Sequence, residues 1–154
     1  MSGMPFSYTL RLFYIPAILM ILGGLLATSG LIVAKKPDAK EALAKLTPYQ
    51  GIIGVALLGY CAYYWITWLE MFKGAIKFSP ILPSLTFLGW FIGGLLLGFL
   101  LGMPQIAKWI PGESDAEQKV MELQKKLMPF QTIFGIIGLV DGLLLILYGA
   151  GILK

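Results

Sequence analysis

The sequence predicts an all-α integral membrane protein in which four transmembrane helices form two parallel two-helix repeats, joined by interfacial amphipathic connector helices. Three observations lead to this prediction. Of the 154 residues, 58% are hydrophobic and 13% are charged, whereas soluble proteins carry about a quarter charged residues. Four apolar stretches reach the ~20 residues that a helix needs to cross a hydrocarbon core. Finally, KLTPYQGIIGVALL, from Lys45, recurs as KLMPFQTIFGIIGL, from Lys126, with seven of the fourteen positions identical.

The four apolar stretches account for most of the chain. Because little sequence lies outside them, we expect residues 1–154 to form a single membrane domain without a soluble domain. The first stretch is longer than the roughly 7–15 apolar residues of a signal peptide, so we interpret it as a helix of the bundle rather than a cleaved leader. The predicted spans are Phe13–Ala34, Gln50–Phe72, Leu85–Met103 and Gln131–Leu153.

The recurring stretch divides the chain into two units, about 11–72 and about 81–154. Each unit reads as a helix, a polar connector, a Leu-x-Pro-aromatic-Gln motif and a second helix. Two helices per unit give both units the same orientation in the membrane, as in transporters with parallel repeats. We therefore expect both charged connectors on one side of the membrane, and both termini with the middle loop on the other.

The shared motif marks the start of the second helix in each unit. Proline needs no amide partner and suits the first turn of a helix, so we interpret the motif as a turn from the interface into the bilayer. Two roles are open for its glutamines: capping free backbone groups at the helix start, or pairing with each other across a pseudo-twofold axis. The motif residues are Pro48, Tyr49 and Gln50 in the first unit, and Pro129, Phe130 and Gln131 in the second.

The second connector is predicted to contain an amphipathic helix over Ser114–Met128. Val120 and Leu123 fall near one face, and Ser114 with Glu117 forms a capping-box pattern. Such a helix either lies along the membrane surface or docks on a partner protein.

Lysine and arginine counts predict the orientation of the bundle. Eight basic residues lie in the two connectors and four lie on the opposite side, which favours cytoplasmic connectors. We expect the membrane to be a bacterial inner membrane. Because the basic residues cluster at membrane borders, the net charge of +4 does not indicate a nucleic-acid partner. The connector residues are Lys35, Lys36, Lys40, Lys45, Lys108, Lys119, Lys125 and Lys126, and the others are Arg11, Lys73, Lys77 and Lys154.

Missing residue types exclude several classes of chemistry. The chain has no histidine and a single cysteine, Cys61. This removes bis-histidine haem, the usual zinc and copper sites, and intramolecular disulfides. The sequence also contains no phosphate-binding glycine loop and no Ser/His/Asp set. We therefore expect no enzymatic activity, no metal site and no cofactor.

Asp141 is the sharpest candidate for a functional residue, because it lies near the middle of the fourth predicted span. A charged group at that depth costs several kcal/mol or more unless it is neutralised, paired or wetted. The repeat aligns it with Tyr60. Three interpretations are open: a neutral acid that hydrogen-bonds a neighbouring helix, for example through Tyr60; a site that binds or relays a proton or cation; or an ion pair with a basic group on another subunit.

Glycines at intervals of four residues predict helix faces that pack closely. Such faces serve either packing within this chain or contacts with neighbouring subunits, and the pattern does not separate the two. The residues are Gly89, Gly93, Gly94, Gly98, Gly102, Gly138 and Gly142.

The second span is rich in aromatic residues over Tyr60–Phe72. Part of this set is explained by an aromatic belt at the membrane border. The remainder predicts a surface for a lipophilic ligand or another protein, near Tyr63, Tyr64, Trp65 and Trp68.

Together these features predict a non-enzymatic integral-membrane subunit of a larger complex, in a structural, assembly or accessory role, as part of a hetero- or homo-oligomer. The prediction follows from the small extramembrane mass, the glycine-rich faces, the surplus of aromatic residues and Asp141, which has no basic partner at mid-span. The alternative is a small proton- or cation-coupled transporter or channel subunit that uses Asp141.

Overall fold

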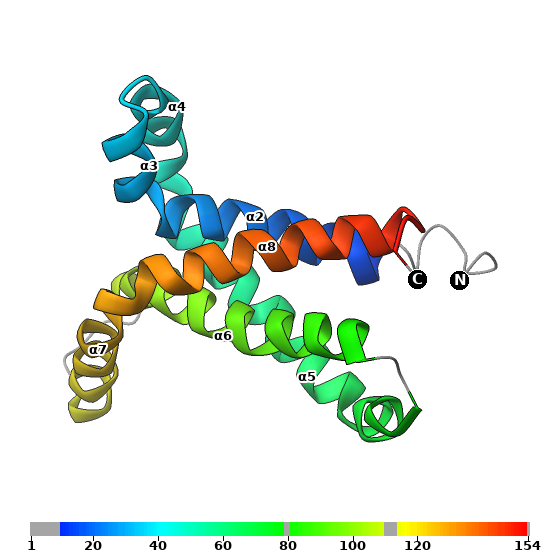
Figure 1. Cartoon of the computed structure of the whole chain (residues 1–154). Helices are drawn as coiled ribbons and strands as arrows, with labels where there is room; N and C mark the ends of the chain where they lie inside the picture. Colours follow the sequence, from blue (N-terminus) through cyan, green and yellow to red (C-terminus); the bar gives the residue numbers. More distant parts are fainter. Residues whose placement is uncertain (1–9, 79–80, 110–113, 154) are drawn as a thin grey trace.

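The computed structural model describes residues 10–78, 81–109 and 114–153, with the backbone alone at 11–12, 67–78, 81–84, 87 and 116. Within these residues the chain is helical and contains no strand, which confirms the all-α class. In Figure 1 the main helices form a bundle, and shorter helices project from one end. The main helices are α2 (Ile15–Ala27), α5 (Gln50–Phe78), α6 (Ile81–Trp109) and α8 (Gln131–Gly149).

Three continuous helical stretches within the described residues are long and apolar enough to cross a membrane: Ala39–Ile66, Leu88–Trp109 and Glu117–Gly149. A fourth span is present if α2 and the following helix, α3 (Ser29–Lys35), are counted as one, although they meet at an angle of 63°. Length and composition therefore support a membrane protein with three or four spans.

The bend between α2 and α3 differs from the single helix predicted over Phe13–Ala34. The hydroxyl of Thr28 donates a hydrogen bond to the carbonyl of Gly24 at 2.7 Å. Bonding of a threonine side chain to the carbonyl four residues earlier bends helices, and Ser29 and Gly30, which follow, form helix less readily than alanine. Because hydropathy records neither effect, the apolar run predicts the length of this segment but not its break.

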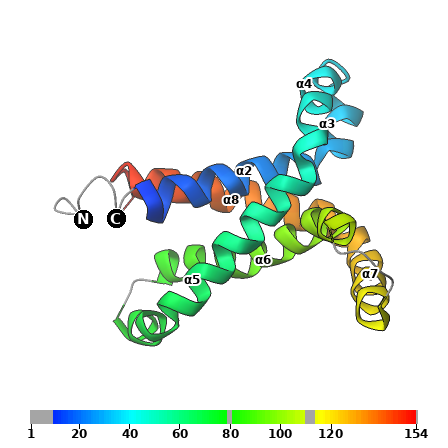
Figure 2. The ribbon, with the colours of Figure 1, turned by 180° about the vertical axis from the view of Figure 1, so that it is seen from behind.

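The bundle is built from two helix pairs. α5 packs most extensively against α6, and α2 packs most extensively against α8. Smaller contacts of α6 with α8 and of α2 with α5 join the two pairs, whereas α5 and α8 are not packed against one another. Figures 1 and 2 show that the pairs meet near the start of α8 and diverge toward its end.

Glycine allows close approach within both pairs. In the α2–α8 pair, a Cβ atom on Gly24 would lie 2.7 Å from the carbonyl oxygen of Gly135. In the α5–α6 pair, a Cβ atom on Gly98 would lie 2.7 Å from the backbone nitrogen of Leu58. At these separations the helix backbones are in direct contact, which is how small residues stabilise helix association in membranes.

The proline motif forms the same turn in both copies. Thr47–Tyr49 and Met128–Phe130 are single 3-10 turns with a proline at one of their first positions. They lead directly into α5, which begins at Gln50, and into α8, which begins at Gln131. Both helices therefore start at the positions that the motif predicts.

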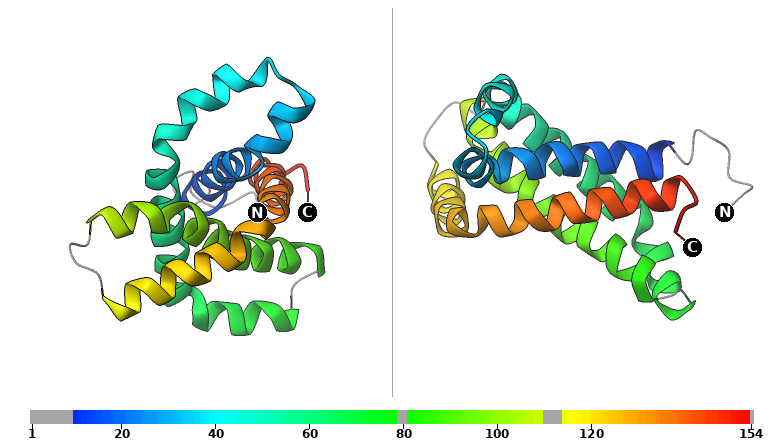
Figure 3. Two further views of the ribbon diagram at one scale, coloured as in Figure 1. Left: turned by 90° about the vertical axis from the view of Figure 1, so that its left-hand side faces the viewer. Right: turned by 45° about the horizontal axis from the view of Figure 1, so that its top comes forward.

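The connector helices lie across the end of the bundle where the two pairs meet (Figure 3). The helix of the first connector is α4 (Ala39–Leu46), which follows α3, and the helix of the second is α7 (Asp115–Leu127). The predicted cap of α7 is confirmed, because the side-chain oxygen of Ser114 accepts a hydrogen bond from the backbone N–H of Glu117 at 3.2 Å.

α7 is joined to α6 through a buried side chain. Pro104, inside α6, has no N–H, so the carbonyl of Leu100, four residues earlier, lacks its helical donor. Gln124 of α7 supplies a donor, because its Nε2 atom lies 2.9 Å from the oxygen of Leu100. The second connector is thus anchored to the body of the bundle by a hydrogen bond that α6 cannot make for itself.

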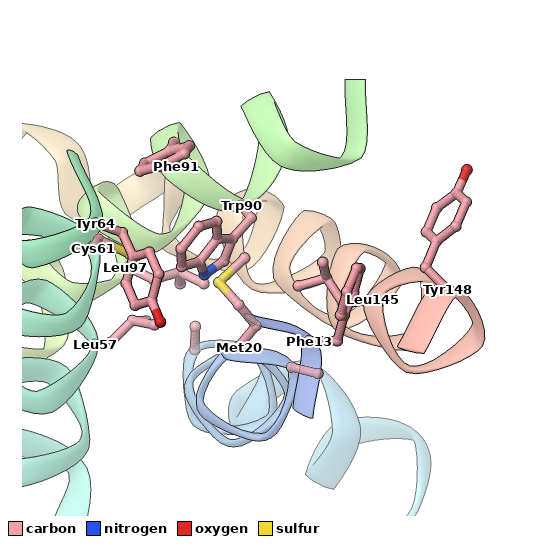
Figure 4. Close-up of a cluster of buried hydrophobic side chains, with 12 residues drawn as sticks. Phe13, Met20, Leu57, Cys61, Tyr64, Trp90, Phe91, Leu97, Leu145 and Tyr148 are labelled. Atoms are coloured by element: carbon pink, nitrogen blue, oxygen red, sulfur yellow. The ribbon is translucent and has the colours of Figure 1, made fainter. Parts of the chain in front are cut away.

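The centre of the bundle is an apolar cluster to which all four main helices contribute (Figure 4). Met20 of α2, Leu57 of α5, Trp90 of α6 and Leu145 of α8 are all inaccessible or nearly so. The ring of Trp90 packs edge-on against that of Tyr64, with ring centroids 5.6 Å apart. This cluster fixes the position of α6 relative to α8, and the candidate site adjoins it.

Candidate functional site

Asp141 is the buried acidic residue of the described part of the chain, with 5% of its side chain exposed. The glycines on either side of it bring α8 close to two other helices. A Cβ atom on Gly142 would lie 3.0 Å from the carbonyl oxygen of Ala17 in α2, and one on Gly138 would lie 2.6 Å from a methyl carbon of Leu97 in α6. Asp141 is therefore held in the interior, where α8 packs between α2 and α6.

The carboxyl group of Asp141 faces Gly89 of α6. A Cβ atom on Gly89 would lie 3.0 Å from Oδ1, 3.4 Å from Cγ and 3.6 Å from Oδ2 of Asp141. The carboxyl group thus lies against the surface that glycine leaves open on α6. This pairing joins the two helix pairs, since Asp141 belongs to the α2–α8 pair and Gly89 to the α5–α6 pair.

Three buried polar atoms in this region make no hydrogen bond within the described residues: Oδ2 of Asp141, Nε1 of Trp90 and the hydroxyl oxygen of Tyr148. Trp90 follows Gly89 on α6, and Tyr148 follows Asp141 by seven residues on α8, which is about two helical turns. α6 and α8 therefore carry one buried acid and two unused donors, of which Tyr148 lies further along α8 (Figure 4).

The surroundings of Asp141 favour its neutral form. The ion pair observed among the described residues does not involve Asp141. It joins Glu41 to Lys45 at 3.5 Å, on the exposed surface of α4. A charged aspartate at the centre of a membrane helix costs about 2.5–3.5 kcal/mol in insertion measurements. Nothing observed around the carboxyl group offsets this cost, so the carboxylic acid is the favoured species.

Tyr60, which the repeat aligns with Asp141, lies in a different environment. Its hydroxyl donates to the hydroxyl of Tyr64 at 3.4 Å, and its ring lies edge-on to that of Trp90, with ring centroids 6.4 Å apart. Because Tyr60 is on α5, it is on a helix that does not pack against α8. Both residues thus contact the same segment of α6, one at Trp90 and the other at Gly89.

The aromatic residues of α5 divide between the interior and the surface. Tyr64 is buried in the central cluster, whereas Tyr63 and Trp65 expose 62% and 46% of their surface. The ring of Trp65 packs edge-on against that of Phe91, with ring centroids 5.8 Å apart. Trp68 belongs to α5, but its side chain lies outside the described residues. The outward aromatic surface is therefore formed by Tyr63 and Trp65.

All seven glycines that the sequence predicts for helix packing face other parts of the same chain. Gly89 faces the carboxyl group of Asp141, and the other six face backbone or apolar side chains of neighbouring helices. These contacts are Gly93 with Met20, Gly94 with Cys61, Gly98 with Leu58, Gly102 with Gly54, Gly138 with Leu97, and Gly142 with Ile21. All seven positions therefore serve packing within the chain.

The motif glutamines are not brought together. Gln50 and Gln131 are half-buried at the starts of α5 and α8, and these helices do not pack against one another. The other motif side chains that carry rings, Tyr49 and Phe130, are both exposed beside them. The motif therefore lies at the connector end of the bundle, away from the carboxyl group of Asp141.

Sequence reasoning missed the buried polar residues Trp90, Gln124 and Tyr148. A signal for Tyr148 was present, because a spacing of seven residues places it on the same face of a helix as Asp141. Gln124 carries a weaker signal, since Pro104 predicts an unsatisfied carbonyl but not the residue that reaches it. For Trp90 the sequence offers no signal beyond its position next to a glycine.

No group of three or more His, Cys, Asp or Glu residues that could hold a metal ion occurs in the described part of the chain.

No protein-family model, curated protein or solved structure matches this chain.

Proposed function

We propose that the protein is a small transporter or channel subunit, without enzymatic activity, that moves a proton or another cation across the membrane by binding it at Asp141. The observation that carries the proposal is the buried carboxyl group, whose Oδ2 atom makes no hydrogen bond within the described residues. Ionisable residues inside membrane spans are costly and mark ion pathways or proton relays. A carboxyl group with a free oxygen is able to take up and release a cation.

The other two interpretations of Asp141 receive less support. A purely structural acid would be expected to use both oxygens in hydrogen bonds to a neighbouring helix, because unsatisfied buried polar groups destabilise a fold. If Asp141 formed an ion pair with a basic group on another subunit, its carboxyl group would be expected at the surface of the bundle. Asp141 is 5% exposed and faces Gly89, so such a partner would have to separate α8 from α6.

The proposal includes the predicted architecture of two parallel two-helix repeats with four spans, in which the bent α2–α3 segment is one span. The packing of the helices supports it. The first helix of unit one, α2, packs against the second helix of unit two, α8, and the first helix of unit two, α6, packs against the second helix of unit one, α5. A twofold relation between the units exchanges these two contacts.

Transport requires the bound cation to meet each side of the membrane in turn, which repeat transporters achieve by moving one bundle against another. Asp141 is on one helix pair and faces the other, so a movement between the pairs changes the surroundings of its carboxyl group. Each single helix-to-helix contact between the pairs is smaller than the contact within either pair. We propose the two pairs as the moving parts.

The proposed location is a bacterial inner membrane, with both connectors in the cytoplasm. Lysines are concentrated in and beside the connector helices α4 and α7, which lie at the same end of the bundle (Figure 3). Cytoplasmic loops carry such an excess of basic residues. Accessibility of single cysteines introduced in α7 of the full chain, in intact cells and in inverted vesicles, tests this orientation.

Flux through proteoliposomes tests the function. The purified chain is reconstituted, and proton movement is followed with an enclosed pH-sensitive dye while sodium and potassium are followed with ion-selective dyes. Asp141→Asn should abolish the flux, because it removes the titrating oxygen while keeping the shape of the side chain. Glu122→Gln, on the exposed surface of α7, is the matched control and should leave the flux unchanged. Equal flux in the wild type and Asp141→Asn would refute the proposal.

A second candidate is the predicted role as a subunit of a larger membrane complex. It is favoured by the outward aromatic surface of Tyr63 and Trp65, next to Ile66, which is 79% exposed. Aromatic residues are enriched at the cores of protein interfaces, and the same surface would also take a lipophilic ligand. Native mass measurement after gentle detergent extraction tests this role. A lone chain that retains full flux would argue against it.

A further inference from the structure

We infer that the cation bound at Asp141 is a proton and not a metal ion. This inference rests on the proposed function and specifies its substrate. It concerns the same carboxyl group and uses four features of its surroundings: the supply of oxygen ligands, the space beside Gly89, the charges nearby and the unused hydrogen-bond donors.

Too few oxygen atoms of the described residues surround Asp141 to coordinate a metal ion. Hard cations take about six or more oxygen ligands. Among the described residues, the other buried side-chain oxygens on α6 and α8 belong to Thr86 and Tyr148, and Tyr148 is about 10 Å further along the helix. α6, α8 and α2 are continuous helices at this level, so their carbonyl groups are used in helical hydrogen bonds. A proton needs a single oxygen.

The space beside the carboxyl group also favours a proton. Oδ1 of Asp141 would be 3.0 Å from a Cβ atom on Gly89, and Oδ2 would be 3.6 Å from it. A metal ion bound to a carboxylate lies about 2.0–2.6 Å from the oxygen. An ion on the α6 side of the carboxyl group would therefore have to push the two helices apart, whereas protonation adds no heavy atom.

Charges and titratable groups on the elements packed against Asp141 are few. Besides Asp141, α8 carries one titratable residue, Tyr148. α2 carries no charged or titratable residue, and the described side chains of α6 include none before Lys108. Tyr14, at the end of η1 (Leu10–Tyr14), lies 3.4 Å from the position of a Cβ atom on Gly149, at the far end of α8. Arg11 is also in η1, but its side chain lies outside the described residues. Since no described cation faces the carboxyl group, a bound proton is what keeps it neutral.

One unused donor is on the helix that faces the carboxyl group. Nε1 of Trp90, next to Gly89, makes no hydrogen bond within the described residues. Because Trp90 is on α6 and Asp141 is on α8, a displacement of one helix against the other changes the separation of this donor from the ionised group, which it can reach directly or through a water molecule. Tyr148 also has an unused hydroxyl, but it is on α8 itself, about two turns from Asp141, and such a displacement does not bring it closer.

Infrared difference spectroscopy of the full chain in lipid tests the inference without any requirement for transport. A protonated carboxyl group has a C=O stretching band separate from that of a carboxylate, and subtraction of the Asp141→Asn spectrum isolates the band of Asp141. We expect this band at pH 7, where an exposed aspartate is ionised, and we expect its loss in alkaline buffer. Replacing choline chloride by sodium or potassium chloride at fixed pH should leave it unchanged.

Two outcomes would overturn the inference: absence of a protonated band at every pH, or its loss when sodium or potassium is added at fixed pH. Asp141→Glu guards against misfolding of the asparagine variant, because it should keep a protonated band at a shifted position. The flux assay separates the two proposals. If sodium drives a flux that requires Asp141, the inference that the bound cation is a proton is refuted, whereas the proposed transport function stands. If the expected infrared band is found without any flux, the transport function is refuted, whereas proton binding at Asp141 stands.

Discussion

Gln124 and Leu100 are joined by a 2.9 Å hydrogen bond, from the side-chain amide of α7 to the backbone carbonyl that Pro104 leaves without a donor in α6. The bond lies at the connector end of the bundle, and Gln124 is 3% exposed. It compensates for a break in the helical ladder of a membrane span, where water does not supply the missing donor.

Gln124→Leu should destabilise the chain by about 1–3 kcal/mol, because it leaves a buried carbonyl unsatisfied. The loss is measured by thermal unfolding in detergent. Gln118→Leu, at an exposed position of the same helix, is the control and should have little effect. In a Pro104→Ala background, where the introduced alanine supplies the N–H that the carbonyl of Leu100 lacks, Gln124→Leu should cost much less. Additive effects of the two substitutions would contradict this explanation.

Gly89→Ala should weaken both stability and flux. The added Cβ atom would lie 3.0 Å from Oδ1 of Asp141, and overpacking of a filled interior costs about 1–3 kcal/mol. This exceeds the gain of roughly 1 kcal/mol that alanine brings to a helix. Gly59→Ala is the matched control, because open space surrounds that position in α5, and it should raise the unfolding temperature.

A second substitution distinguishes a clash with the carboxyl group of Asp141 from general crowding around Gly89. If the loss in Gly89→Ala comes from contact with the acid, then Asp141→Ala should make room for the new methyl group. The double variant should therefore be more stable than Gly89→Ala alone. A double variant that is less stable would place the conflict elsewhere on α6.

Composition and local patterns were sufficient for the helical class, for the starts of α5 and α8, and for the cap at Ser114. Each of these depends on residues that are neighbours in the chain. The bend at Thr28 was not predicted, although it is also local, because the apolar run continues through it and hydropathy records neither the Thr28 hydrogen bond nor the weak helix formation of Ser29 and Gly30.

The surroundings of Asp141 were beyond prediction for a different reason. The sequence identifies the residue by its position in an apolar run, but Gly89 lies 52 positions earlier and is one of several glycines at similar spacing. Which glycine meets the carboxyl group depends on the packing of α6 against α8, and that is set by the whole interior, including Trp90 and Leu97. Tyr60 was one possible partner suggested by alignment of the repeats, and the helix that carries it packs most extensively against α6.

Gly54→Ala should be among the most destabilising single substitutions in the bundle. The new Cβ atom would overlap the backbone of Leu101 and Gly102 in α6, and a backbone cannot move aside as a side chain can. α5 and α6 would have to separate, with a loss of several contacts at once, and the expected cost is about 3 kcal/mol or more. Unfolding in detergent measures it against Gly59→Ala on the same helix. A cost below that of Gly89→Ala would show that the α5–α6 contact is loose.

A hydrophobic carbodiimide should label Asp141 selectively. The O–H of a neutral carboxylic acid adds across a C=N bond of the reagent, and the product rearranges to a stable acylurea that retains all atoms of both reactants. The reagent concentrates in lipid, so exposed acids on the connector helices, such as Glu122, are reached less readily. Intact mass should show one adduct per chain, peptide mapping should place it in α8, and flux should fall as labelling proceeds. Equal labelling of Asp141→Asn would show that the reactive acid is elsewhere, whereas a water-soluble carbodiimide should reach the connector acids and leave Asp141 unmodified.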